Sequence, residues 1–269
     1  MTLPDLTILI GPYTRLSRAI NATIRAGRGP LRSVGVAAFP TRIASPSARA
    51  LALDEAPADV RRATFQTKLG AEGPFLLAAL NFLGAPSRSL HKRDLFPHMA
   101  SVCLGLAKSW DTSLRLVLAV EPLDLFFASV GSDALAKRVR ATPWEALYEV
   151  SWADLAGDIA AAIPQAELCV ITPETALCRS EQLARTVFGS ASEAIDPKAW
   201  QDAHLSEEGK AAVAQLADTS PTEGMMLELG EALGNTPTAE EIEMRFGIDR
   251  LTQTLLRQRF EEDLARIAD

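Results

Sequence analysis

The sequence contains little cysteine and little histidine, with three of each in 269 residues. An odd and widely spaced set of cysteines excludes a disulfide framework, and none of them lies in a CxxC pair. We therefore expect them to be small core-filling residues in a protein from a reducing cytoplasm. No His-x-x-x-His or CxxC spacing indicates a metal site. The cysteines are Cys103, Cys169 and Cys178.

The sequence also lacks an excess of positive charge and a long apolar segment. Its net charge is −7 and its isoelectric point is about 5.2, so general affinity for nucleic-acid phosphates or anionic lipid is not expected. The apolar stretch at residues 74–82 is too short to cross a bilayer. No basic segment precedes the first apolar run, unlike in a signal peptide. These features predict a soluble, cytoplasmic protein with no nucleic-acid or membrane partner.

Apolar runs alternate with helical patterns over residues 6–188. Strands this apolar need cover on both faces, which predicts a three-layer α/β fold with a parallel sheet. The segment at residues 40–57 is rich in Pro, Ser and Ala, and we expect a surface excursion there. Strands are expected at residues 6–10, 34–39, 114–120 and 167–171, while residues 74–80 fit either a strand or a helix. Helices are expected at residues 14–26, 58–69, 97–109, 123–137, 152–163 and 174–188.

From about residue 197 the pattern changes to strongly charged helical segments separated by Gly and Pro. This change predicts an α/β domain at residues 1–196 and a C-terminal helical subdomain at residues 197–269. Most of the acidic residues in the second unit are expected on solvated helix faces, and partner binding is the alternative.

The turn that follows the first strand reads GPYTRLSR, residues 11–18. A phosphate-binding loop at a helix start needs small residues so that backbone N–H groups can close on the anion, and a lysine and a hydroxyl help. No lysine is present here, and Leu16 stands where a glycine would be wanted. An ordinary strand–helix turn with solvent-facing arginines is the alternative. The candidate anion-binding residues are Gly11, Thr14, Arg15, Ser17 and Arg18.

A second candidate segment, EPLDLFFAS, follows the apolar strand at residues 114–120. Binding sites in parallel sheets lie beyond the carboxyl ends of the strands. Asp124 and Ser129 could therefore contact a ligand. Asp124 in the first turn of a helix is also ordinary capping, which is the alternative.

The order of these motifs resembles the sulfotransferase-like branch of the P-loop proteins, in particular the bacterial proteins that begin IGPHKTGTT. The motifs here are strand–GPxxxxS–helix, followed by an apolar strand and a D-x-x-x-x-S helix. The resemblance implies a sulfotransferase-like P-loop topology, with a first loop that binds the 5′-phosphosulfate of 3′-phosphoadenosine 5′-phosphosulfate (PAPS). It also implies a later Arg and Ser, eight positions apart, that bind the 3′-phosphate. Further segments that match are Asn81-Phe82-Leu83-Gly84, Leu95-Phe96-Pro97, the W-x-x-L pattern at residues 152–155 and the ARI of the C-terminal tail.

Several positions depart from the family pattern. Tyr13 stands at the family's His, Thr14 at its phosphate-binding Lys and Leu16 at its loop Gly. Glu121 stands where the Arg for the 3′-phosphate belongs, while Ser129, eight residues later, matches the Ser. One lost cation and one reversed charge predict that PAPS binding is weakened by several orders of magnitude. Leu16 in place of Gly is expected to crowd the N–H groups of the loop as well.

Two functional hypotheses follow from the resemblance. The favoured one is a pseudoenzyme with an eroded cofactor loop and no cofactor, acting as a binding or interaction protein. It leaves open a protein partner, a second copy of the chain, or a nucleotide or other anion. The alternative is an active PAPS-dependent sulfotransferase, or a related transferase. There Arg15 and Arg18 would serve the phosphates, Ser17 and Ser129 would donate hydrogen bonds, and His91 would be the candidate base. A surface-loop histidine is the other interpretation of His91.

Overall fold

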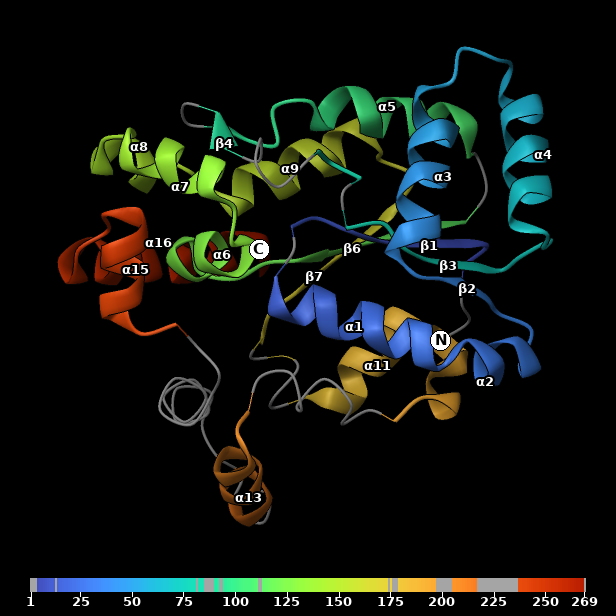
Figure 1. Ribbon diagram of the computed structural model, residues 1–269. Helices are drawn as coiled ribbons and strands as arrows, with labels where there is room; N and C mark the ends of the chain where they lie inside the picture. Colours follow the sequence, from blue (N-terminus) through green and yellow to red (C-terminus); the bar gives the residue numbers. More distant parts are fainter. Residues whose placement is uncertain are drawn as a thin grey trace.

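The computed structural model describes residues 4–12, 14–80, 82–84, 90–91, 94–110, 113–173, 175, 179–196, 205–216 and 237–268. In these residues an all-parallel, five-stranded sheet lies between helices on its two faces (Figure 1). The strand order is β2-β3-β1-β6-β7. The predicted α/β class with a parallel sheet is therefore confirmed. The strands are β1 (Leu6–Ile10), β2 (Ala37–Phe39), β3 (Phe75–Ala78), β6 (Leu114–Ala119) and β7 (Glu167–Ile171).

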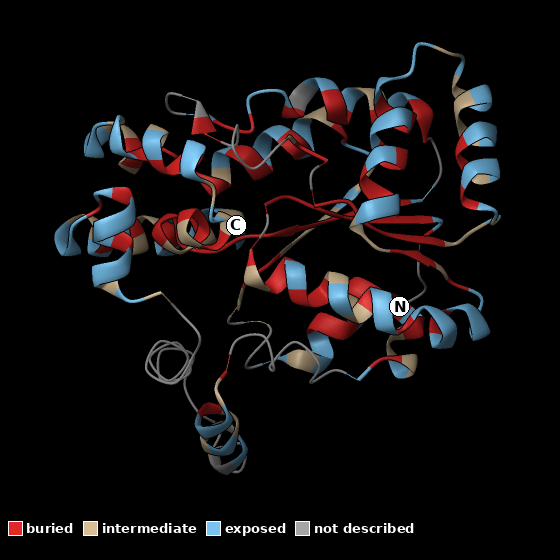
Figure 2. Cartoon of the chain, viewed as in Figure 1, coloured by how far each residue is buried: buried red, intermediate tan, exposed pale blue. Residues whose placement is uncertain are grey.

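The central strand β1 pairs with β3 on one side and β6 on the other, so that Leu6 is opposite both Phe75 and Leu114. Every residue of these three strands is buried, as Figure 2 shows for the middle of the molecule. A strand that is apolar at nearly every position needs apolar cover on both faces, and the helices supply it.

The helices form one layer on each face of the sheet (Figure 1). One face carries α1 (Arg15–Ala26), α2 (Arg28–Ser33) and α11 (Ser180–Phe188). The other carries α3 (Thr41–Leu53), α4 (Ala58–Leu69), α5 (Met99–Ser109) and α9 (Trp152–Ala162). Each layer encloses its own apolar core.

The described chain contains further helices and one more pair of strands. Beyond the carboxyl end of β6 lie α6 (Leu123–Val130), α7 (Asp133–Arg140) and α8 (Trp144–Tyr148). A small antiparallel pair is formed by β4 (Leu90–His91) and β5 (Asp94–Leu95). The later elements are the 3₁₀-helix η2 (Gly189–Ala194) and the helices α13 (Glu207–Leu216), α15 (Ala239–Phe246) and α16 (Arg250–Ala268).

The prediction of a surface excursion at residues 40–57 is wrong, because most of this segment forms α3. Its small residues are a packing surface: Ala44, Ala48 and Ala52 recur at helical spacing and are buried. The backbone of α3 lies so close to α5 that a Cβ added at Gly105 would overlap the Ala52 carbonyl. Alanines that looked typical of a loop therefore allow two helices to approach closely.

Two other helix predictions differ in their bounds. The helix predicted at residues 123–137 is divided into α6 and α7 at Gly131, which adopts a left-handed conformation with φ +66°. A left-handed glycine ends a helix readily, and Ser132 then caps α7. In the segment predicted as a helix at residues 174–188, Thr175 is helical, Arg179 is not, and α11 begins at Ser180. Residues 174 and 176–178 lie outside the described chain.

The helices α15 and α16 share the larger core with the α/β part of the chain. Ile242, Phe246, Leu256 and Phe260 are buried there, and the two helices contact α6, α7, α8 and α9. The division of the chain near residue 197 stays a prediction, and residues 197–204 and 217–236 lie outside the described part.

Cys103 is buried, as expected of a core-filling residue, and Cys169 is half-buried. Cys178 falls outside the described residues.

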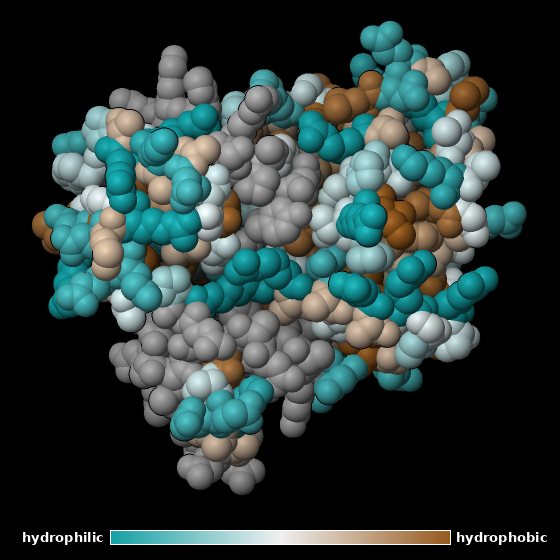
Figure 3. Space-filling view, viewed as in Figure 1, coloured by the Kyte–Doolittle hydropathy of each residue, from teal (hydrophilic) through white to brown (hydrophobic). Residues whose placement is uncertain are grey.

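No helix in the described part of the chain combines the length and apolar content needed to cross a membrane. Hydrophilic side chains cover most of the described surface in Figure 3, and apolar residues form small groups between them.

Candidate functional site

The topology of the sheet places a switch point between the carboxyl ends of β1 and β6, which we name the crevice. After β1 the chain passes into α1 on one face, whereas after β6 it passes through α6–α8 to α9 on the other face (Figure 1). Ligands of open α/β sheets bind where neighbouring connections diverge in this way. The two candidate segments of the sequence, residues 11–18 and 121–129, both begin at this crevice.

Gly11 allows the first segment to pass directly against the end of β6. Its φ is +108°, and an added Cβ would lie 2.9 Å from Cδ1 of Leu118. A residue with a side chain would be strained here by both its backbone conformation and this contact. The close turn between β1 and α1 therefore requires glycine.

The hydroxyls at the start of α1 are used within the turn itself. Thr14 is the N-cap, and its Oγ1 accepts a hydrogen bond of 3.0 Å from the Ser17 N–H. The Ser17 hydroxyl donates to the carbonyls of Pro12, at 2.7 Å, and Thr14, at 3.0 Å. Both side chains are fully buried. The N–H and the hydroxyl of Ser17, which a phosphate would need as donors, therefore already have acceptors.

Leu16 is fully buried and belongs to the apolar core between α1 and the sheet, with Ile20 and Ile24 one and two turns later. This spacing places the three side chains on the inward face of the helix. Leu16 therefore anchors the first turn of α1 to the sheet.

The two arginines of the first turn differ in exposure. Arg18 is exposed, whereas Arg15 is half-buried. Burial lowers the pKa of Arg15, and the nearby positive charge of Arg18 lowers it further, while the charge of Glu121 raises it. Arg15 is thus the cation that lies closer to the interior of the crevice.

Glu121 is the most unusual group of the site. It lies two residues after β6 and is only 2% exposed. Burial raises the pKa of its carboxyl to about 7, against the lowering effects of the Ser129 hydroxyl and of the charges of Arg15 and Arg18. Its Oε1 has no hydrogen-bond partner among the described residues. A buried carboxyl therefore lies within the electrostatic influence of two arginines and is about half protonated near pH 7.

A second buried carboxyl, Asp124, lies in the first turn of α6. Its Oδ2 is 3.2 Å from Nε of Arg257, which comes from α16. Burial raises the pKa of Asp124, and the charge and hydrogen bond of Arg257 lower it. This pair ties the C-terminal helix to the side of the crevice.

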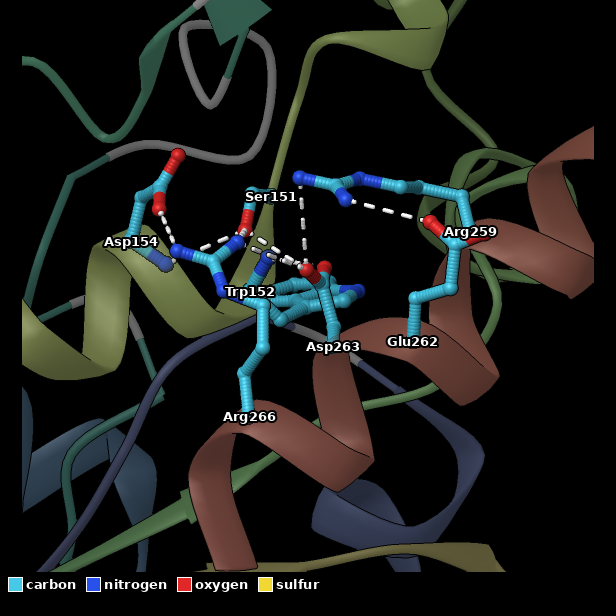
Figure 4. Close-up of polar contacts among 7 residues, drawn as sticks. All are labelled: Ser151, Trp152, Asp154, Arg259, Glu262, Asp263 and Arg266. Carbon is cyan, nitrogen blue, oxygen red and sulfur yellow. Dashed lines mark hydrogen bonds and ion pairs between the residues drawn. The ribbon is translucent and has the colours of Figure 1, made fainter. Parts of the chain in front are cut away.

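Asp263 makes a second connection from α16 (Figure 4). Its side chain points to the start of α9, where its two oxygens accept hydrogen bonds of 2.7 Å from the Ser151 hydroxyl and the Trp152 N–H. The Trp152 indole in turn donates to the backbone carbonyl of Glu121 at 2.9 Å. The C-terminal helix thus helps to fix the position of Glu121. Arg266 adds a contact of 2.6 Å to Asp154.

Most of the candidates from the sequence meet at the crevice. The first segment contributes Gly11, Thr14, Arg15, Ser17 and Arg18, and Ser129 joins them through its contact with Glu121. Sequence reasoning missed Arg257 and Asp263. They lie more than a hundred residues from their partners in a charged helix, and no local pattern marks a charged residue of a helix as buried.

The histidines contribute little to the described site. The backbone of His91 belongs to β4, where it pairs with Asp94, but its side chain lies outside the described residues, as does His204. His98 is exposed. No group of three or more potential metal ligands occurs in the described part of the chain.

No family model, no curated protein and no solved structure matches this chain.

Proposed function

We propose that the protein is a sulfotransferase-like pseudoenzyme, with P-loop topology and an eroded PAPS site, that acts as a binding or interaction protein. The observation that carries the proposal is Glu121. This buried carboxyl faces Arg15 and contacts Ser129 at the crevice where the resemblance implies an arginine for the 3′-phosphate. An ionised carboxylate in that place repels a phosphate and also offsets the charge of Arg15.

The turn at the start of α1 supports the same conclusion. Thr14 replaces the lysine that the resemblance implies, and its hydroxyl caps the helix. Loss of one charge-assisted hydrogen bond weakens binding by about 1.5–3 kcal/mol. The second lost interaction, at Glu121, would concern the 3′-phosphate at the other end of PAPS. Two such losses reduce affinity multiplicatively, because the sites are separate.

The transferase alternative requires groups that the described residues use otherwise. Arg15 would have to serve a phosphate, but the charge of Glu121 already acts on it. Ser17 would have to donate to the ligand, but its hydroxyl donates to backbone carbonyls. The described contacts therefore favour the pseudoenzyme.

A thermal-shift screen at pH 8 tests the proposal, with adenosine 3′,5′-bisphosphate, PAPS and common nucleotides as ligands. A ligand at a hundred times its dissociation constant adds about 2.7 kcal/mol to the stability of the native state. We expect no nucleotide to produce a saturable rise in the melting temperature. A saturable rise with adenosine 3′,5′-bisphosphate that is lost in Arg15→Ala would support the transferase instead.

A further inference from the structure

We infer that the outer edge of β2 is a docking site for an extended, acidic peptide segment of a partner protein, which adds to the sheet as a further strand. β2 is the last strand on one side of the sheet and packs beside α2 (Figure 1). A groove of about 310 Å³ follows this edge and touches all three residues of the strand. It is bordered by the segments that precede β2 and β3, whereas the crevice lies where β1 and β6 end. The inference therefore does not depend on the PAPS site.

The backbone of β2 offers hydrogen bonds on the side away from β3. The Ala37 N–H donates to the Pro74 carbonyl, so the backbone groups of Ala37 and Phe39 face β3. Along a strand, the N–H and C=O groups of successive residues point to opposite sides. Those of Ala38 therefore face the groove, where no strand of the described chain pairs with β2. Through such groups an edge strand binds an extended peptide.

The groove is a slot between the two helix layers. One wall is α2, and the other is the segment Leu69–Gly73 at the end of α4. The two helices belong to layers on opposite faces of the sheet (Figure 1). The second wall consists mostly of small residues, and a Cβ added at Gly70 would meet nothing within 4 Å. A strand placed in the groove would thus continue the sheet between its two layers.

The charge of the groove favours an acidic peptide. The charged residues that line it are Arg28, Arg32 and Glu72, all of them exposed. Neither arginine has a carboxylate partner among the described residues. They are one helical turn apart, about 6 Å along the axis, which is close to the roughly 6.8 Å between alternate side chains of a strand. Two acidic residues at alternate positions of a peptide therefore match the two arginines.

Arg28 covers the edge in the absence of a peptide. Its guanidinium lies 5.7 Å from the centre of the Phe39 ring. That ring belongs to the core on the face opposite to α2, so the Arg28 side chain passes the outer edge of β2 to reach it, and Ala38 is only 5% exposed. A cation–π contact at an exposed site is weaker than a charge-assisted hydrogen bond. A peptide carboxylate would therefore draw Arg28 from the ring and uncover the edge.

A second copy of the chain fits this edge less well than an acidic peptide. Two identical edges pair in antiparallel fashion about a two-fold axis perpendicular to the sheet, which brings each helix layer against the same layer of the other copy. Arg28 and Arg32 would then approach their own counterparts, and like charges repel. A short edge strand flanked by charged side chains resists this kind of self-association.

Fluorescence anisotropy of the full chain with a labelled, capped heptapeptide of sequence TEVEVET tests the inference. We expect saturable binding in the micromolar range, and no binding of TKVKVKT. Arg32→Ala should weaken binding of TEVEVET about tenfold, because one charge-assisted hydrogen bond is lost. The double variant Arg28→Glu and Arg32→Glu should bind TKVKVKT instead. Arg49→Ala is the matched control, since Arg49 is exposed on α3 and does not line the groove, and it should bind as the wild type does.

Changes in the peptide backbone separate strand addition from simple attraction between charges. One peptide carries N-methyl groups on its three glutamates, and a second carries them on its two valines. Because only alternate residues of an added strand direct their N–H groups to β2, one of these peptides should lose binding and the other should keep it. Exchange of the Ala38 amide hydrogen, followed by NMR, should slow when TEVEVET binds.

Four results would overturn the inference: no binding of TEVEVET, equal binding of TKVKVKT, equal effects of the two methylation patterns, or unchanged exchange of the Ala38 amide in the complex. A dimer of the free protein that protects the Ala38 amide and does not dissociate with the peptide would also overturn it, because a second copy would then occupy the edge. Failure of the proposed function would look different: adenosine 3′,5′-bisphosphate would bind tightly, with or without the peptide.

Discussion

At the scale of single residues, Glu121 combines a costly environment with a position that is typical of ligand-binding residues. It is buried, one of its oxygens has no partner among the described residues, and it lies at the end of a central strand where parallel sheets bind ligands. The sequence allowed Glu121 to be identified as a departure from the family pattern. Its burial and raised pKa could not be predicted, because both depend on helices that are distant in sequence.

The pKa of Glu121 predicts how stability changes with pH. The native carboxyl binds a proton more tightly than the unfolded one, whose pKa is 4.5. The free energy of unfolding should therefore fall as pH rises from about 4.5 through 7, by up to roughly 3 kcal/mol. In Glu121→Gln this part of the pH dependence should disappear, and the variant should exceed the wild type in stability at pH 8. Urea denaturation between pH 5 and pH 8 measures both effects.

Glu145→Gln is the control for that experiment, because Glu145 is exposed on α8 and its substitution should leave the pH profile unchanged. If the free energy of unfolding of Glu121→Gln changed with pH as steeply as that of the wild type, Glu121 would not titrate in this range.

At the scale of elements, local patterns predicted β1, β6, α1 and α9 well, since each has clear apolar spacing or a clear cap. The N-cap of α9 is Ser151, whose side chain accepts a hydrogen bond from the Asp154 N–H. The predictions for residues 40–57 and 123–137 differ from the structure for physical reasons. The small residues of α3 were interpreted as a loop because their role, close packing on Gly105, depends on a distant helix. The break at Gly131 was missed because both sides continue a helical pattern.

The contact between α16 and α9 should contribute strongly to stability. Asp263 is 1% exposed, accepts two hydrogen bonds from the start of α9 and lies 3.5 Å from Arg266. Asp263→Ala removes these partners together, so we expect a loss of about 3 kcal/mol or more in the free energy of unfolding. Chemical denaturation measures it.

Glu262→Ala, one residue earlier on the same helix, is the matched control. Its side chain is 43% exposed and lies 3.3 Å from Arg259 in an ion pair, so its loss should cost within about 0.5 kcal/mol. Similar losses in the two variants would contradict the role given to Asp263.

At the scale of the whole molecule, the C-terminal helices α15 and α16 share an apolar core with the α/β part of the chain. The sequence predicts a separate helical unit because strongly charged helical segments, separated by Gly and Pro, begin near residue 197. The structure adds what composition cannot reveal: α15 and α16 contribute Ile242, Phe246, Leu256 and Phe260 to the larger core. A charged helix contains only a few apolar residues, and its sequence does not show which part of the protein they pack against.

A fragment of residues 1–196 should therefore fail to fold cooperatively. It would lose the apolar cover of α6 and α9 and leave Asp124 buried without Arg257. Circular dichroism and a thermal melt of the fragment, compared with the full chain, measure this. A cooperative melt with native-like signal would instead support two independent units.

We propose that the PAPS site is eroded, and calorimetric titration of the full chain with adenosine 3′,5′-bisphosphate at pH 8 tests this proposal. At this pH Glu121 is mostly ionised, so its charge would repel a 3′-phosphate in the proposed site. The account predicts no measurable heat of binding at millimolar ligand. Binding in the micromolar range or tighter would contradict it.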